Sequence, residues 1–201
     1  MIYIISDVKK SLGLEWIITK VKKDFKLRII LINSKNSSFE KWIIKNKIQY
    51  INLNYKKKYI DFIPVLLSII LYLIKNRTKY VHCHLRKASL LGLIASYLLR
   101  IKKRVYTRHH GIESDNVRFE KVLDKIVFYL ATDIIAISEE MKSLTIDNNK
   151  FIKKKVTKIH HGFNLDYFKS TKLNNFEKIF RKYKLKKNYY IIGVISRIVY
   201  W

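Results

Sequence analysis

All six histidines of this sequence fall in three close pairs, and this spacing is its first feature that could support chemistry. The pairs are His82 with His84, His109 with His110, and His160 with His161. Each pair closes or follows a short β-branched run, which predicts that it stands at the end of a strand. Because imidazole titrates near neutral pH, such residues can move protons, contact oxyanions or bind metals.

Three interpretations of the pairs remain open. The histidines could be structural and bond only to nearby carbonyl groups. They could bind a metal, since alternation along a strand places His82 and His84 on one face. No carboxylate or thiolate stands at a recognised ligand spacing, which speaks against a metal site. In the third interpretation the imidazoles line a cleft and meet sugar hydroxyls and phosphate oxygens.

The elements that must position these residues alternate between strands and helices. We expect strands at residues 2–5, 27–32, 50–52, 80–84, 104–107, 133–137, 156–160 and 190–195. We expect helices at residues 12–22, 39–45, 62–75, 88–99, 121–130, 139–146 and 176–183. The strand runs are continuously apolar, so the pattern predicts a doubly wound parallel α/β sheet of the Rossmann-like class.

Ligands of such a sheet bind outside the carboxyl ends of its strands. Polar residues follow the predicted strands at this edge: Ser6 and Asp7, then Ser138 and Glu139, then Gly162. No convincing GxGxxG follows the first strand, so the usual dinucleotide-binding fingerprint is absent from the sequence.

Composition indicates the size of the core and the cellular compartment of the protein. Nearly half of the 201 residues are hydrophobic, which provides for a sizeable core. The single cysteine, Cys83, excludes an internal disulfide and favours a reducing, cytoplasmic compartment. The first residues lack a basic region and predict a strand rather than a signal peptide. The longest apolar run, residues 62–74, is shorter than the roughly 20 residues of a membrane span, so we expect a buried or interfacial helix.

A formal net charge of +27 leaves three explanations open. Much of it could be compositional drift, because residues favoured by A+T-rich codons are abundant. An anionic membrane surface would also attract this charge, at the inner face of the plasma membrane. Nucleic acid is the less favoured partner, since the basic residues are scattered along the chain and form no stripe interleaved with aromatic side chains.

The last residues predict the start of a second unit. Residues 184–188 form a polar joint, and residues 189–197 read as a strand that runs into a loop. We therefore expect one domain at residues 1–187 and the first strand of another at 188–201. The expectation is that the chain is cut just as this second domain begins.

Five segments together resemble the amino-terminal domain of family 4 glycosyltransferases, which have the GT-B fold. They are YVHCH at 80–84, VYTRHHG at 105–111, DIIAISE at 133–139, VTKIHHGFN at 156–164 and GVISR at 193–197. The order and spacing of the segments carry the resemblance, which covers essentially the whole chain. The glycine pair usual in the first loop is absent, and Asn164 replaces the usual aspartate.

The resemblance implies a retaining sugar transfer from a nucleotide-sugar, without a metal or other cofactor. It places His109 against the transferring sugar. Donor or diphosphate contacts fall on Arg197, Ser138 and Gly162. Acceptor contacts fall on Ser6, Asp7, Glu15, His84, Arg108 and His110.

The hypothesis is thus a partial glycosyltransferase that acts on a polysaccharide or lipid-linked acceptor in cell-envelope glycan synthesis and is inactive alone. Alternatives are a relative of the sugar-nucleotide 2-epimerases, a non-catalytic acceptor- or partner-binding half of a split enzyme, and a basic nucleic-acid-binding protein.

Overall fold

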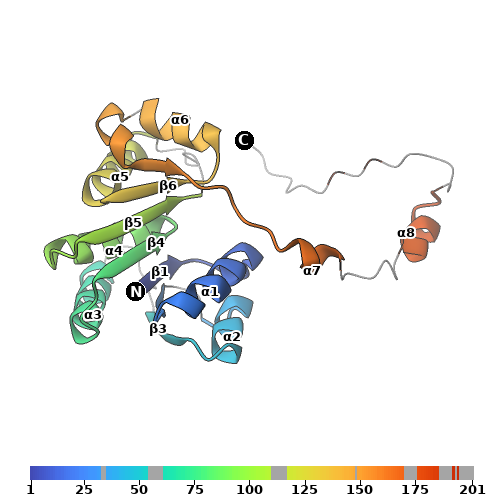
Figure 1. The fold of residues 1–201 in the computed structure, drawn as a ribbon, viewed down its shortest axis with the longest axis horizontal. Coiled ribbons are helices and arrows are strands. Elements are labelled where there is room, and N and C mark those ends of the chain that lie inside the picture. The colour runs from blue at the N-terminus through green and yellow to red at the C-terminus, as the bar shows by residue number, and fades with distance from the viewer. Residues whose placement is uncertain are drawn as a thin grey trace. The chain divides into compact units, whose positions relative to one another are not determined.

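Seven strands pair in one fully parallel sheet, in the order β3-β2-β1-β4-β5-β6-β7 (Figure 1). The strands are β1 Ile2–Ser6, β2 Arg28–Ile32, β3 Gln49–Leu53, β4 Tyr80–His84, β5 Lys103–Arg108, β6 Asp133–Ala136 and β7 Val156–Lys158. The computed structural model describes residues 1–32, 35–53, 61–109, 117–147, 149–169, 176–185, 192 and 194.

Helices cover both faces of the sheet. They are α1 Leu12–Asp24, α2 Ser38–Lys45, α3 Phe62–Lys75, α4 Arg86–Leu98, α5 Val117–Leu130 and α6 Glu139–Asp147. A 3₁₀ helix η1 spans Lys150–Lys155, and two further helices, α7 Leu165–Lys169 and α8 Phe176–Lys182, follow in the chain. One core cluster joins α1 and α2 to β1 and β2, and a larger one joins α3, α4 and α5 to the opposite face. The predicted doubly wound α/β fold is confirmed.

The direction of winding reverses between β1 and β4. From β1 the chain winds outward through β2 to β3, and α3 then carries it back to β4 on the other side of β1. Connections that leave neighbouring strands in opposite directions open a crevice between their carboxyl ends. We therefore expect a ligand outside the ends of β1 and β4, at Ser6 and His84.

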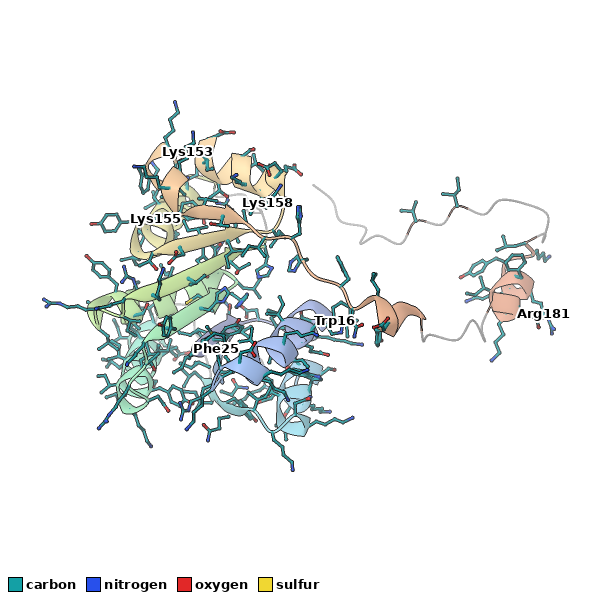
Figure 2. All side chains as sticks on the ribbon, viewed as in Figure 1. Trp16, Phe25, Lys153, Lys155, Lys158 and Arg181 are labelled. Carbon is teal, nitrogen blue, oxygen red and sulfur yellow. The ribbon has the colours of Figure 1, made fainter. Side chains whose placement is uncertain are left out.

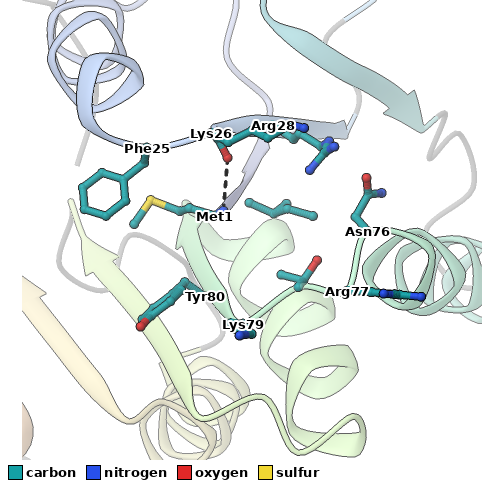
Figure 3. A pocket seen from close by; sticks show the side chains of 10 residues that line it. Met1, Phe25, Lys26, Arg28, Asn76, Arg77, Lys79 and Tyr80 are labelled. Carbon is teal, nitrogen blue, oxygen red and sulfur yellow. Dashed lines mark hydrogen bonds between the residues drawn. The ribbon is translucent and has the colours of Figure 1, made fainter.

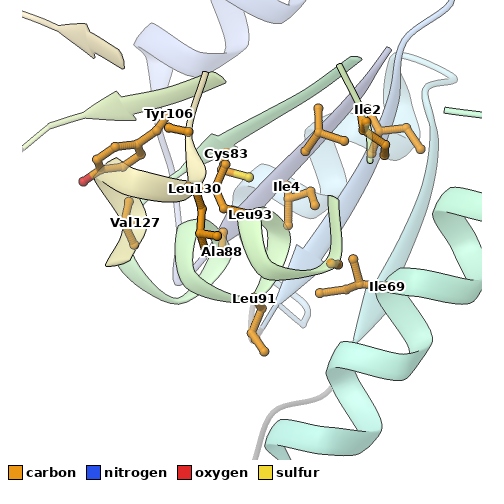
Figure 4. Close-up of a cluster of buried hydrophobic side chains, with 14 of the residues drawn as sticks. Ile2, Ile4, Ile69, Cys83, Ala88, Leu91, Leu93, Tyr106, Val127 and Leu130 are labelled. Atoms are coloured by element: carbon orange, nitrogen blue, oxygen red, sulfur yellow. The ribbon is translucent and has the colours of Figure 1, made fainter. Parts of the chain in front are cut away.

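Helix α4 packs unusually close to these two strands because of Gly92. A Cβ atom at this position would lie 2.7 Å from both the Cys83 sulfur and the Ile4 Cδ1 atom. Both neighbours are fully buried in the cluster of Figure 4. The absent side chain thus sets how deeply α4 sits on β1 and β4.

The structure differs from the sequence-based expectations at several boundaries. Helix α5 begins four residues earlier than expected, β7 ends at Lys158 instead of residue 160, and α7 and η1 were not anticipated. The expected strand at 190–195 lies outside the described residues except for Ile192 and Val194, which are exposed and belong to no strand.

The chain divides into two compact units, residues 1–163 and 164–201. The expected domain boundary at 187/188 stays a prediction. In the part of the chain that the structure describes, no helix is long and apolar enough to cross a membrane.

Some of the positive charge has a structural use. The Lys155 ammonium group donates to the carbonyl oxygens of Tyr129 and Ala131, at 3.2 and 2.9 Å (Figure 2). These carbonyls end α5, where a cation also complements the helix dipole. Burial lowers the pKa of Lys155, and the nearby Arg104 lowers it further.

Replacing Gly92 by alanine is expected to destabilise the fold by about 1–3 kcal/mol, because overpacking a tight core forces side chains off their rotamers. Gly162→Ala is the matched control: its Cβ would meet nothing within 4 Å, and its φ is not positive. The control should be neutral or stabilising by up to about 1 kcal/mol. Urea unfolding measures both, and equal stabilities of the two variants would contradict the close packing.

Candidate functional site at the carboxyl edge of the sheet

Four histidines form a continuous chain of rings at the carboxyl edge. The ring centroids of His82 and His84 are 4.2 Å apart, those of His84 and His109 5.5 Å, and those of His109 and His161 5.4 Å. His84 Nδ1 lies 3.2 Å from His109 Nε2, and His82 Nε2 lies 2.7 Å from the Thr107 hydroxyl. The predicted convergence of strand ends thus brings together both members of the first histidine pair and one member of each of the other two; His160 is exposed and His110 lies outside the described residues.

Burial keeps the inner members of this chain neutral. His84 is 1% exposed, and burial, reinforced by His82, His109 and His161, lowers its pKa well below the usual value. Burial and His109 lower the pKa of His82 to about 3. Tyr3 packs edge-on against His82, and burial raises the pKa of this phenol to about 12. His82 and His84 therefore provide neutral hydrogen-bonding groups rather than fixed positive charges.

One tautomer of His84 is favoured. Its Nε2 atom is buried and has no hydrogen-bond partner. A buried N–H group without a partner is rarer in proteins than a buried acceptor without one. The proton of neutral His84 therefore belongs on Nδ1, from which it donates to His109 Nε2. That bond leaves a neutral His109 with its own proton on Nδ1, as a donor.

Ser6 and Asp7 hold the amino-terminal end of α4 against β1. The Ser6 hydroxyl, fully buried, accepts a hydrogen bond from the Ala88 amide at 3.2 Å and so caps α4 from another strand. The Asp7 carboxylate pairs with Lys87 at 3.2 Å. Sequence reasoning missed Lys87, although a cation in the first turn of a helix opposes the helix dipole and so needs a partner.

The turn between β4 and α4 carries backbone strain. Leu85 has φ 69° and ψ 164°, a region that only glycine adopts readily. Its carbonyl accepts from both the amide and the hydroxyl of Ser89, at 2.9 and 2.6 Å. Strained residues of this kind cluster at functional sites, which agrees with the position of Leu85 directly after His84.

The start of α1 approaches the segment that follows β7. A Cβ atom on Gly13 would lie 4.0 Å from His161 Nδ1, and the rings of Trp16 and Phe163 meet at 6.3 Å. Glu15 stands in the first turn of α1, and burial raises its pKa although Lys10 acts in the opposite direction. The predicted acceptor residue Glu15 thus belongs to an element that contacts the histidine chain.

Ser138 has a structural task at the end of β6. Its hydroxyl accepts from the Met141 amide at 3.1 Å and so caps α6. Next to it, Glu139 forms an ion pair with Lys158 at 2.6 Å, which lowers the pKa of Glu139. This arrangement occupies one lone pair of the Ser138 hydroxyl, and the predicted donor contact of Ser138 stays a prediction.

Arg108 does not line the crevice. Its guanidinium forms an ion pair with Asp124 of α5 at 3.1 Å and lies 5.1 Å from the centre of the Phe128 ring. Neighbouring side chains of a strand point to opposite faces, so the side that brings Thr107 to His82 turns Arg108 toward α5. The geometry gives Arg108 a structural role, and the acceptor contact stays a prediction.

The remaining predicted residues lie at the margins. Gly162 is exposed after β7 and needs no special backbone conformation. Asn164 accepts from the amides of Asp166 and Tyr167 and so caps α7, as its side chain allows. Arg197 lies outside the described residues. Among the residues that are described, no group of three or more His, Cys, Asp or Glu side chains could hold a metal ion.

Sequence comparison identifies the relatives of this chain. Residues 21–167 match the family model "Glycosyltransferase Family 4". A capsular polysaccharide biosynthesis glycosyltransferase, CapM of Staphylococcus aureus, is 35% identical over 141 residues, which are 67% of this chain and 37% of CapM. The chain therefore corresponds to well under half of this relative.

Solved structures share the fold. A glycosyltransferase from Rickettsia africae matches with a TM-score of 0.68 at 22% identity, over 93% of this chain and 50% of that structure. Anabaena HepE in complex with UDP-glucose matches with a TM-score of 0.68 at 16% identity, over 92% and 50%. A UDP-GlcNAc 2-epimerase from Methanocaldococcus jannaschii matches with a TM-score of 0.65 at 15% identity, over 92% and 53%. The chain thus spans about half the length of these proteins.

Acid should weaken the fold through the buried histidines. Below about pH 6.5 the unfolded chain binds protons that folded His82 and His84 exclude, so stability falls as the pH decreases. His84→Gln removes one such group, and its loss of stability between pH 7 and 5 should be smaller than that of the native chain by about 2 kcal/mol. Urea unfolding at both pH values measures this, with His160→Gln as the exposed control. Identical pH dependence in His84→Gln and the native chain would refute the neutral buried state.

Removing the carboxylate that faces Arg108 should be costly. Asp124→Asn leaves the buried guanidinium without its counter-ion and is expected to destabilise the fold by about 3 kcal/mol. The double variant Arg108→Met with Asp124→Leu removes both charges and should recover most of this loss. Thermal unfolding distinguishes the two cases, and a stable Asp124→Asn variant would show that the pair has no structural role.

Proposed function

Because this chain belongs to glycosyltransferase family 4, we propose that it forms the acceptor-side half of an enzyme that transfers a sugar from a nucleotide-sugar to a glycan or lipid-linked acceptor. One observation supports this above the others. The chain of four histidines stands at the carboxyl edge of the sheet, beside the crevice between β1 and β4. Ligands of this class of sheet bind there.

We assign His109 the contact with the transferring sugar. It is half-buried at the carboxyl edge of the sheet, and its contact with His84 fixes its ring where it could orient a sugar hydroxyl. A hydrogen-bonding ring that is held in place in this way can position a polyhydroxylated substrate. Arg197 is proposed to contact the diphosphate, whose growing negative charge a cation stabilises during departure.

The donor and the pathway are proposals drawn from relatives. The neighbour HepE was solved with UDP-glucose, which favours a UDP-sugar as co-substrate. The relative CapM serves capsular polysaccharide biosynthesis, which favours a cell-envelope glycan as product and the cytoplasmic face of the membrane as the place of synthesis. We propose that the reaction proceeds with retention and without a metal, and that these 201 residues alone do not turn over a nucleotide-sugar.

A 2-epimerase is the second candidate, because epimerases share the fold. Fold similarity at this low identity does not separate the two activities. The higher identity to a glycosyltransferase favours sugar transfer.

The test joins residues 1–187 to the carboxyl-terminal half of CapM and supplies UDP-sugars with lipid-linked acceptors. We expect sugar transfer, reduced about 100-fold or more in kcat by His109→Ala because the sugar loses its orientation. His160→Ala is the control, since its side chain is exposed beside the histidine chain. Epimerisation of the UDP-sugar without an acceptor, or full transfer by His109→Ala, would contradict the proposal, as would turnover by the 201-residue chain alone.

A further inference from the structure

Helix α3 is apolar on its outer face as well as its inner one. Its inner residues Val65, Ile69 and Leu73 are buried in the core. The side chains that point outward are also large and apolar, and they recur at helical spacing: Ile63 is 58% exposed, Leu67 52%, Leu71 66% and Ile74 55%. A surface helix normally carries polar residues on its solvent face, so this outer stripe needs a partner other than water.

Helix α4 extends the stripe. It lies beside α3 (Figure 1), and Tyr97 and Leu98 near its end are 45% and 60% exposed. Both helices run from the carboxyl edge of the sheet to its amino edge, so these residues lie at the same edge as Ile74. The outer apolar surface is defined by Ile63, Leu67, Leu71, Ile74, Tyr97 and Leu98.

Cations border the outer apolar surface at the amino edge of the sheet. Lys75, Arg77 and Lys79 follow along α3 and its exit, and Arg100 and Lys102 follow α4; all five are exposed. Neither α3 nor α4 contains an acidic residue. At the same edge lies a pocket of about 260 Å³, which Figure 3 shows. Arg77 and Lys79 line it together with two further cations, Lys26 and Arg28.

We propose that the outer apolar surface docks this chain onto an anionic lipid bilayer, with α3 lying in the interface and the bordering cations on the headgroups. Apolar side chains on one face and basic residues beside them are what an interfacial helix requires. A second copy of the chain fits poorly, because the same cations would face each other across a symmetric contact. Nucleic acid would engage the cations but leave the apolar stripe in water.

This inference deepens the proposed function and rests on it for its purpose. Helix α3 runs from the carboxyl edge of the sheet, where the crevice lies, to the amino edge. A bilayer under α3 would therefore lie parallel to the strands. The crevice would then open along the membrane rather than away from it. An acceptor anchored in lipid could reach the site without leaving the bilayer.

Vesicle sedimentation of the 201-residue chain tests the docking. We expect binding to vesicles of phosphatidylglycerol and phosphatidylcholine, release by high salt, and little binding to phosphatidylcholine alone. Leu71→Asp should weaken the partition coefficient about tenfold or more, because a carboxylate enters the interface. Ile44→Asp is matched to it in charge and exposure, being 56% exposed on α2 across the sheet, and should bind much more tightly than Leu71→Asp.

A second pair of variants isolates the charges. Lys75→Gln with Lys102→Gln should weaken binding more than Lys20→Gln with Lys41→Gln, which removes two exposed cations from α1 and α2. The proposal would be overturned if Leu71→Asp and Ile44→Asp weakened binding equally, or if the two double Lys→Gln variants did. Equal binding of the native chain to neutral and anionic vesicles would also overturn it. The proposal would also be overturned if the native chain formed a dimer in the absence of vesicles and Leu71→Asp dissociated that dimer. Sugar transfer is measured separately with a detergent-soluble acceptor, so a chain that transfers sugar but ignores vesicles refutes the docking alone.

Discussion

The close contact of α4 with β1 and β4 is the constraint on which the site depends. Gly92 permits the contact, because any side chain there would meet Ile4 and Cys83 in the core. The depth of α4 in turn places its first turn within reach of the Ser6 hydroxyl, 3.2 Å from the Ala88 amide. The ends of the two strands are therefore positioned by packing about one helical turn further along α4.

The histidine chain follows a second constraint, which is that buried polar groups need partners. On the face of β4 and β5 that is turned away from α4, the partners are other members of the site: Thr107 for His82 and His109 for His84. Each bond fixes the ring that makes it, so His109 is oriented before any substrate arrives. Rigid support of this kind is what a group that positions a sugar requires.

Sequence reasoning could predict the sheet and the gathering of histidines, because parallel strands end at one edge and the apolar runs mark those strands. It could not predict the cap of α4, because Ser6 belongs to β1, far from α4 in the sequence, and local sequence patterns do not indicate contacts between distant residues. The structural role of Arg108 could have been predicted. Strand alternation places Arg108 on the face opposite Thr107 and on the same face as Tyr106, which is the face that α5 covers. Ser138 matched a cap pattern and a ligand position equally well, and only the 3.1 Å contact with Met141 reveals the cap.

The contact between Ser6 and α4 also has a bearing on how the chain folds. It joins residues 82 positions apart, so α4 has no cap until β1 and β4 have paired around the loop between them. Closing so long a loop is a slow, entropically costly event compared with forming a helix. The site is therefore complete only after segments that are far apart in the chain have met.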